Sequence, residues 1–123
     1  MSARTDLVET YHEGFRFPDH AMILDTLTDD VAWDLPGHRH LNGKADFDDE
    51  ISNPAFQSSP ELTIDRFIEG RDAVVAIGEG TAQTAEGADF HFAYVDLFTF
   101  RADLICRVES YVVPLAGGWA PGT

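Results

Sequence analysis

The chain has 123 residues, of which 44% are hydrophobic, and its formal net charge is -14. This length fits one compact domain with a buried core, which excludes a disordered chain. The acidity excludes strong binding to nucleic acids or anionic membranes, because both carry the same charge. The single Cys106 leaves no internal disulfide or zinc-site spacing, and no apolar stretch is long enough for a signal peptide or a membrane span. We therefore expect a soluble cytoplasmic protein.

The first half of the chain predicts helices. Apolar residues recur at helical spacing over residues 5–17, and Pro18 ends that segment. Asp19 can cap a second, shorter helix. A strand is expected over residues 31–35, and a third helix over about residues 44–52.

The second half of the chain predicts strands. Turn signals rich in glycine and aspartate separate four strand-like segments, which are residues 62–69, 73–84, 90–100 and 104–113. Helices followed by strands predict an α+β fold. We expect residues 1–123 to form a single domain with a core over about 5–115, followed by a flexible, glycine-rich and proline-rich tail over 116–123.

Residues 90–100 carry the strongest indication of chemistry. Side chains alternate along a strand, so one face gathers Phe90, Phe92, Tyr94, Asp96, Phe98 and Phe100. We expect this aromatic face to be buried, with Asp96 in its middle. A carboxyl in an apolar wall is commonly held neutral, and it can then donate a hydrogen bond or act as a general acid or base. The alternative is that Asp96 bonds a backbone amide or a side chain of the first helix and only orders the fold.

The neighbouring strands offer further candidate pocket residues. The larger side chains of residues 73–84, Glu79 among them, share one face. This pattern suggests a pocket lining, although a sheet rim exposed to water explains it equally well. On residues 104–113, Val108 and Ser110 share a face.

Two histidines follow a Pro-Gly turn signal. His38 and His40 could line the mouth of a pocket and supply a base at neutral pH, or they could form a metal pair with Asp34. Their place in a polar loop favours ordinary surface histidines over both roles. Two further histidines, expected to be structural, are His12 and His91.

Several motifs follow one another in a definite order: Tyr11, residues 27–33, Pro36-Gly37, Gly43-Lys44 and residues 94–100. Together they resemble the superfamily that contains nuclear transport factor 2, ketosteroid isomerase and the SnoaL-type polyketide cyclases. The resemblance covers about residues 5–115. It implies a cone-shaped, curved antiparallel sheet covered by three N-terminal helices, with an open end that admits a small hydrophobic molecule. It also implies a homodimer formed through the back of the sheet.

The same resemblance implies roles for particular residues. Tyr11 and Asp96 match the two hydrogen-bond donors of the isomerase, a phenol and a neutral carboxylic acid. The proton-shuttling aspartate of the isomerase falls at Leu35, which can carry no proton. The water-holding positions of the related epoxide hydrolases fall at Trp33, Leu35 and Ser110, and their other carboxylate falls near Glu79. Neither reaction can therefore be copied across intact.

We expect acid–base chemistry of the isomerase or cyclase type on a carbonyl-bearing molecule that resembles a steroid or a polyketide. Asp96 would be the acid, Tyr11 would assist it, and Glu79 or a mouth histidine would accept the proton. The alternative is a non-catalytic ligand-binding or interaction module, which Leu35 favours. No metal or cofactor is expected. The expected ligand contacts are Trp33, Leu35, Phe92, Tyr94, Phe98, Val108, Ser110, His38 and His40.

Overall fold

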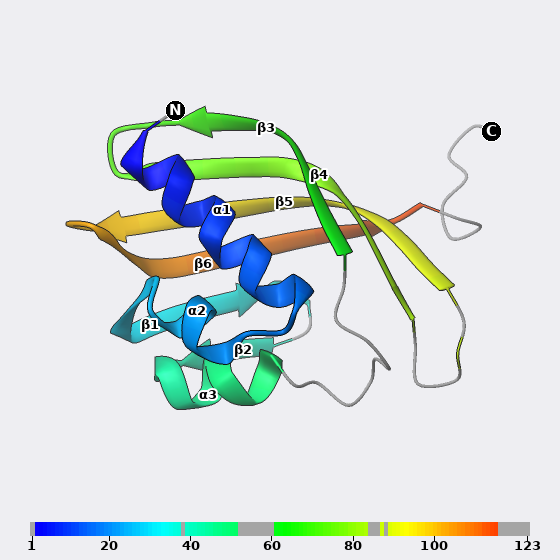
Figure 1. The fold of residues 1–123 in the computed structure, drawn as a ribbon, viewed down its shortest axis with the longest axis horizontal. Coiled ribbons are helices and arrows are strands. Elements are labelled where there is room, and N and C mark those ends of the chain that lie inside the picture. Colours follow the sequence, from blue (N-terminus) through cyan, green and yellow to red (C-terminus); the bar gives the residue numbers. More distant parts are fainter. Residues whose placement is uncertain (1, 38, 52–60, 84–86, 88, 116–123) are drawn as a thin grey trace.

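The computed structural model describes residues 2–37, 39–51, 61–83, 87 and 89–115, and within them it contains three helices and six strands (Figure 1). In chain order these are α1 (Ala3–Arg16), α2 (His20–Leu24), β1 (Leu27–Leu35), β2 (Arg39–Asn42), α3 (Gly43–Ile51), β3 (Glu61–Glu69), β4 (Ala73–Gln83), β5 (Asp89–Arg101) and β6 (Leu104–Pro114). The predicted α+β class and the order of its elements are confirmed. Two predictions, the tail over 116–123 and the placement of His38, lie outside the described residues.

The helices begin and end where the sequence provides caps. Ser2 is the N-cap of α1, and its hydroxyl accepts a hydrogen bond from the Thr5 backbone N–H at 3.1 Å. Asp19 caps α2 as predicted, because its carboxylate accepts from the Met22 N–H at 3.0 Å. None of the helices in the described part of the chain is long and apolar enough to cross a membrane.

The strands form one curved, open sheet in the order β2-β1-β6-β5-β4-β3. Neighbouring strands are antiparallel except β1 and β6, which run parallel. The prediction was a fully antiparallel sheet, and this parallel pair is the one exception among the described strands. The parallel pair arises because the chain reaches the far edge at β3 and then returns by hairpins, until β6 lies beside β1. The polar edge strand β2 is a second difference, since its residues were expected to form a loop.

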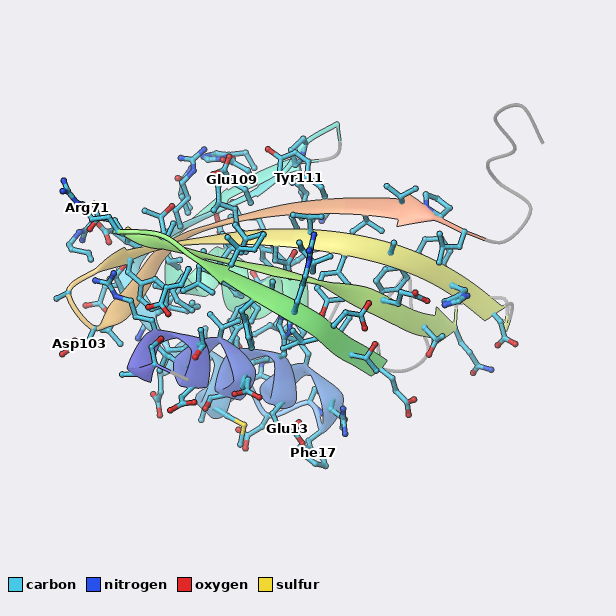
Figure 2. All side chains as sticks on the ribbon, turned by 90° about the horizontal axis from the view of Figure 1, so that it is seen from above. Glu13, Phe17, Arg71, Asp103, Glu109 and Tyr111 are labelled. Carbon is cyan, nitrogen blue, oxygen red and sulfur yellow. The ribbon has the colours of Figure 1, made fainter. Side chains whose placement is uncertain are left out.

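The helices lie on one side of this sheet, and the other side is left uncovered (Figure 2). Figure 2 places Glu109 and Tyr111 on the uncovered side, away from Glu13 of α1. The helix-covered side is called the concave face here, and the uncovered side is called the convex face. The buried core lies between the helices and the concave face, and its fully buried members include Val8, Ile23, Phe47, Val74 and Phe98.

The concave face depends on a match between β4 and β5. The predicted aromatic face of β5 is the inward one, and the β4 residues opposite it are small: Val74, Ala76, Gly78, Gly80 and Ala82. The aromatic rings need that space. A Cβ atom on Gly80 would lie 2.5 Å from the ring of Phe92, and one on Gly78 would lie 1.9 Å from the carbonyl oxygen of Thr63. Of the two alternatives for the larger side chains of β4, the structure therefore favours a surface exposed to water over a pocket lining, since they occupy the convex face.

Candidate functional site

Asp96 lies on the concave face of β5, where α1 crosses above it. It is 8% exposed and is the one buried acid among the acidic residues that the structure describes. Its carboxyl is not alone, because Nε2 of His12 lies 3.2 Å from Oδ2 of Asp96. His12 is 5% exposed, and its ring lies 5.5 Å from that of Tyr94 and 5.8 Å from that of Phe98. A buried histidine–carboxyl pair therefore stands where the sequence predicted a carboxyl among aromatic rings.

His12 is the site residue that reasoning from the sequence missed. It was expected to be a structural residue of the first helix, beside Glu13. The signal that could have found it is helical spacing. His12 follows Val8 by one turn and belongs to the inward stripe of α1, together with Tyr11 and Phe15.

The two ring nitrogens of His12 differ in their hydrogen-bond partners, and so do the two carboxyl oxygens of Asp96. Nδ1 of His12 is buried and has no hydrogen-bond partner in the described part of the chain. Oδ2 of Asp96 faces Nε2 of His12, while the Asp96 side chain keeps 11% of its surface exposed. The carboxyl therefore has one oxygen held by the protein and retains some accessible surface for a small molecule.

Tyr11 supplies a phenol to the same site. It is 2% exposed, and its ring makes edge contacts with Phe15, Phe47 and Phe98 at centroid distances of 5.1, 6.0 and 5.1 Å. Burial, and secondarily the charge of Asp96, raise the pKa of the Tyr11 hydroxyl well above its ordinary value. Tyr11 therefore stays protonated and can donate a hydrogen bond.

Tyr94 has a different role, because its hydroxyl is already engaged. It donates to the Thr63 carbonyl oxygen on β3 at 2.7 Å. Burial first, and then the charges of Asp96 and Asp65, raise the pKa of the Tyr94 hydroxyl as well. This tyrosine ties β5 to β3 across Gly78.

We expect alkaline pH to unfold the chain rather than to ionise Tyr11 and Tyr94 in place. A tyrosine in the unfolded chain ionises near pH ~10, whereas both folded phenols stay neutral above that pH because their pKa values are raised. The free energy of unfolding therefore falls as the pH rises from the unfolded pKa through the folded ones. Phenolate absorbance and circular dichroism, followed together on a Tyr111→Phe variant that removes the third tyrosine, should change at the same pH. Phenolate formation in a fully folded chain would contradict this expectation.

Trp33 on β1 and Ser110 on β6 are joined by a buried hydrogen bond. The Trp33 indole Nε1–H donates to the Ser110 hydroxyl at 3.0 Å, and the indole stacks on Phe47 at 4.3 Å. Leu35 is partly buried against the same core. The positions at which the related hydrolases hold a water are therefore occupied by an internal hydrogen bond and by an aliphatic side chain.

Five of the predicted ligand contacts are apolar or aromatic side chains that the structure buries. Phe98 and Val108 are 0% exposed, so they are core residues with no surface open to a ligand, which corrects their assignment. Phe92, Tyr94 and Trp33 keep between 3% and 8% of their surface. Trp33 belongs to the main core, whereas Phe92 and Tyr94 pack with Ala82 toward the end of the sheet.

Glu79 and His40 lie away from this site. Glu79 is on the convex face, where its carboxylate pairs with Nε2 of His91 at 3.0 Å and half of its side chain is exposed. His40, on the edge strand β2, pairs with the carboxylate of Asp34, which also binds Arg107. Strand alternation directs both residues away from Asp96, so the prediction that either accepts a proton beside Asp96 is wrong. Among the described residues, no group of three or more metal-ligating side chains converges.

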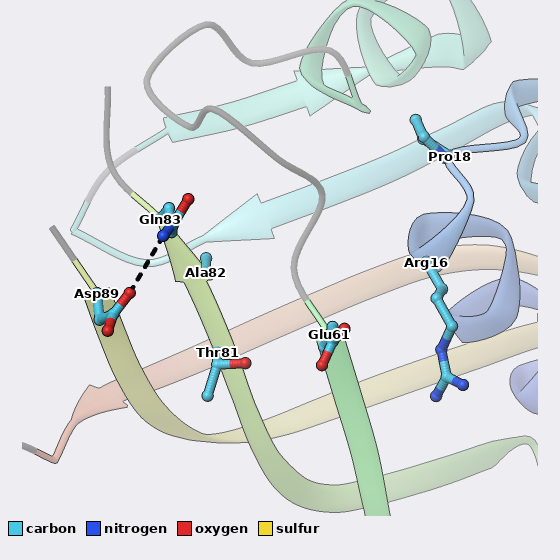
Figure 3. Close-up of a pocket in the computed structure, with 7 residues that line it drawn as sticks. All are labelled: Arg16, Pro18, Glu61, Thr81, Ala82, Gln83 and Asp89. Carbon is cyan, nitrogen blue, oxygen red and sulfur yellow. Dashed lines mark hydrogen bonds between the residues drawn. The ribbon is translucent and has the colours of Figure 1, made fainter. Parts of the chain in front are cut away.

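A cavity of about 500 Å³ opens at the end of the sheet (Figure 3). It is lined by the C-terminal end of α1 and by the ends of β3, β4 and β5, through Arg16, Pro18, Glu61, Thr81, Ala82, Gln83 and Asp89. None of the predicted site residues lines it. Ala82 nevertheless connects it to the interior, since Ala82 packs with Phe92 and Tyr94, and the ring of Tyr94 contacts that of His12. The packed side chains of Phe92 and Tyr94 therefore lie between this cavity and Asp96.

Comparison with known proteins places this architecture in a family. A family model for the SnoaL-like domain matches residues 8–108. A search of the curated proteins finds none that matches the sequence.

Three solved structures are similar in fold. A nuclear transport factor 2-like protein of unknown function from Burkholderia pseudomallei superposes with a TM-score of 0.84 at 20% identity, over 92% of each chain. TerC, co-crystallised with polyporic acid, superposes with a TM-score of 0.83 at 22% identity, over 91% of this chain and 92% of TerC. A protein with a ketosteroid isomerase-like fold from Catenulispora acidiphila, in complex with trimethylamine, superposes with a TM-score of 0.77 at 12% identity, over 85% of this chain and 83% of that one. At these identities the likeness concerns the fold. Because the family model spans most of the sequence, the chain belongs to the SnoaL-like domain family, and its fold is similar to those of nuclear transport factor 2-like and ketosteroid isomerase-like proteins.

Proposed function

We propose that this chain is an enzyme that moves a proton on a small apolar carbonyl compound. Asp96 is the acid–base group and Tyr11 is the hydrogen-bond donor. The observation that carries the proposal is the burial of one carboxyl, 8% exposed, among aromatic rings on the concave face and close to a phenol that stays protonated. Titratable groups that are enclosed in this way are typical of acid–base sites.

The proposed step balances without a metal or a cofactor. The Asp96 carboxylate takes the proton from the carbon next to the carbonyl, so that a C–H bond breaks and an O–H bond forms. The electron pair of the broken bond moves to the carbonyl oxygen and gives an enolate. The Tyr11 O–H donates a hydrogen bond to that oxygen, where the negative charge develops. Protonated Asp96 exchanges its proton with solvent and then protonates the same carbon, which gives exchange. Where the compound is an enone, the enolate is conjugated, and protonation at the far carbon of the conjugated system gives isomerisation.

The surroundings favour an apolar ligand. The side chains around the His12–Asp96 pair are aromatic, which favours an apolar ligand at Asp96. The cavity beyond Phe92 and Tyr94, of about 500 Å³, is lined mostly by polar side chains and is of the size that small-molecule sites commonly have. Similar folds hold small molecules, since TerC was crystallised with polyporic acid and the Catenulispora acidiphila protein with trimethylamine. These complexes support small-molecule binding for this chain, and the carbonyl-bearing class comes from the Asp96–Tyr11 pair.

The experiment that tests the proposal is proton exchange in heavy water. The full chain is incubated with cyclohexanone, α-tetralone or testosterone, and the loss of the α-proton signal is followed by NMR. We expect at least one ketone to exchange faster than in buffer alone, with saturation as its concentration rises. The absence of enzyme-dependent exchange from all of the ketones would contradict the proposal.

A non-catalytic ligand-binding module is the second candidate function. It is favoured by Leu35, which stands where the related isomerase has its base, and by Phe92 and Tyr94, which separate the cavity from Asp96. Binding of α-tetralone, measured by perturbation of backbone amide signals at Ala82 and Phe92 and unaccompanied by exchange, would support this candidate over the enzyme.

We also infer that the convex face joins two copies of the chain in a homodimer. Four large apolar side chains are exposed there, between 39% and 50%: Ile68, Val95, Tyr111 and Val113. Strand register places them on one face, because Tyr111 lies opposite Val95, and Val113 lies opposite Ala93. Large apolar side chains exposed together on one uncovered face are typical of an interface.

The dimer makes a direct prediction about mass in solution. Sedimentation equilibrium should give twice the chain mass of 13.6 kDa for the wild type and the monomer mass for Val95→Glu, because the new charge would be buried against its own copy. Glu79→Gln is the matched control on the same face and should remain dimeric. A monomeric wild type would remove this inference and leave the proposed chemistry unaffected.

A further inference from the structure

We propose that His12 is the positioning residue of this site: its Nε2–H donates to Oδ2 of Asp96 and leaves Oδ1 as the oxygen that exchanges a proton with the substrate. The role assigned to Oδ1 rests on the proposed function. The tautomer of His12 and its bond to Asp96 stand independently of it.

The tautomer follows from the surroundings of the two ring nitrogens. Nε2 faces Oδ2 of Asp96 at 3.2 Å, whereas Nδ1 is buried and has no partner in the part of the chain that the structure describes. A neutral imidazole carries one N–H. A buried N–H without an acceptor is rarer in proteins and more costly than an acceptor without a donor. The proton therefore lies on Nε2, and Nδ1 keeps a bare lone pair.

The same comparison disfavours a doubly protonated ring. An imidazolium would place a second, charged N–H at Nδ1, where the described residues offer it no acceptor. The ring is packed edge-on against Tyr94 and Phe98 and tilted against Tyr11, so it cannot turn to exchange its nitrogens without disturbing the core. His12 therefore presents Nε2, and not Nδ1, to Asp96.

This bond decides which oxygen of Asp96 is available. With Oδ2 accepting from His12, rotation of the carboxyl is restricted, and Oδ1 is the oxygen left for an outside molecule. The accessible 11% of the Asp96 side chain is consistent with this division. Oδ1 can carry the acidic proton or accept one, while Oδ2 accepts from Nε2–H in either state. His12 thus serves both halves of the proposed proton transfer by keeping one oxygen directed at the substrate.

A purely structural clamp between α1 and β5 is the competing explanation, and two substitutions separate the roles. His12→Gln keeps an N–H donor at nearly the position of Nε2, whereas His12→Leu fills similar space without a donor. We expect His12→Leu to lower the kcat for ketone exchange by about 10- to 100-fold, as the loss of orienting partners commonly does, with KM little changed. His12→Gln should remain closer to the wild type than to the leucine variant.

The chain provides its own control pair. His91 and Glu79 join β5 to β4 by the same kind of contact, at 3.0 Å, but on the exposed convex face. His91→Leu should leave exchange unchanged. Equal exchange rates for His12→Leu and the wild type would overturn the positioning role.

A second measurement does not depend on activity. Nitrogen-15 NMR of the histidine rings in the full wild-type chain should show His12 protonated at Nε2 and unprotonated at Nδ1 at neutral pH. A proton on Nδ1, or on both nitrogens, would overturn the inference. If no ketone exchanges but the Nε2–H tautomer is found, the proposed function fails while the His12–Asp96 bond stands. If His12→Leu does not fold, the exchange rate of His12→Gln and the ring spectra of the wild type still test the positioning role and the tautomer.

Discussion

Asp96→Asn is expected to lower the exchange of ketone α-protons by about 100-fold or more, which is the usual contribution of a general acid–base group. Asparagine has nearly the same shape as aspartate, and its amide oxygen can still accept from Nε2 of His12. It cannot take up or release a proton. The loss should therefore fall on kcat, while the binding of α-tetralone is largely kept.

The fold should survive this substitution, so the result can be interpreted. The change removes an ionisable group from a site that is 8% exposed and leaves its volume unchanged, so thermal unfolding should show no loss of stability. Glu79→Gln makes the same chemical change on the convex face, where half of the side chain is exposed, and it should exchange ketones like the wild type. Turnover that Asp96→Asn leaves intact would remove Asp96 from the mechanism.

Gly78→Ala is expected to reduce the free energy of unfolding by about 3 kcal/mol, at the upper end of the usual cost of overpacking. The new Cβ would lie 1.9 Å from the Thr63 carbonyl oxygen and 2.8 Å from the Tyr94 hydroxyl oxygen. The first contact is with backbone, which cannot rotate away, so β3 and β4 must separate there. The same movement weakens the hydrogen bond from Tyr94 to Thr63, which measures 2.7 Å.

Gly70→Ala is the matched control for this loss. A Cβ at Gly70 meets nothing closer than the Ala73 carbonyl oxygen at 3.8 Å, an ordinary contact. Urea unfolding monitored by tryptophan fluorescence should show a large fall in the midpoint for Gly78→Ala and little change for Gly70→Ala. Equal stability of the two variants would mean that β3 and β4 tolerate the extra atom, and that the close packing of β5 against β4 is not required.

Much of the fold could be predicted because local patterns are independent of tertiary context. The turn signals and Pro18 bound the elements, and the alternation on β5 correctly predicted that Asp96 and its aromatic neighbours face inward. Other features depend on a partner that no local pattern contains. Strand β2 has no apolar alternation, and it is a strand only because it pairs with β1.

The candidate site shows the same division. Tyr11 and Asp96 were predicted together, and the structure buries both of them on the concave side. Glu79 was misplaced because β4 carries larger residues on one face and small ones on the other, and local pattern favours the larger face. The aromatic side chains of β5 reverse that preference, since they require the glycines of β4 beneath them.

The sequence by itself determined that this acidic chain of 123 residues forms one α+β fold with a single inward-facing carboxyl on an aromatic strand. Spacing and alternation are properties of neighbouring residues, and they can be read along the chain. Only the tertiary structure decided that His12, 84 positions away, bonds that carboxyl, and that Glu79 lies on the opposite face of the sheet. Both outcomes depend on how side-chain volumes from distant segments fit together, because the large rings of β5 pack against the small face of β4 and His12 of α1 packs against two of those rings.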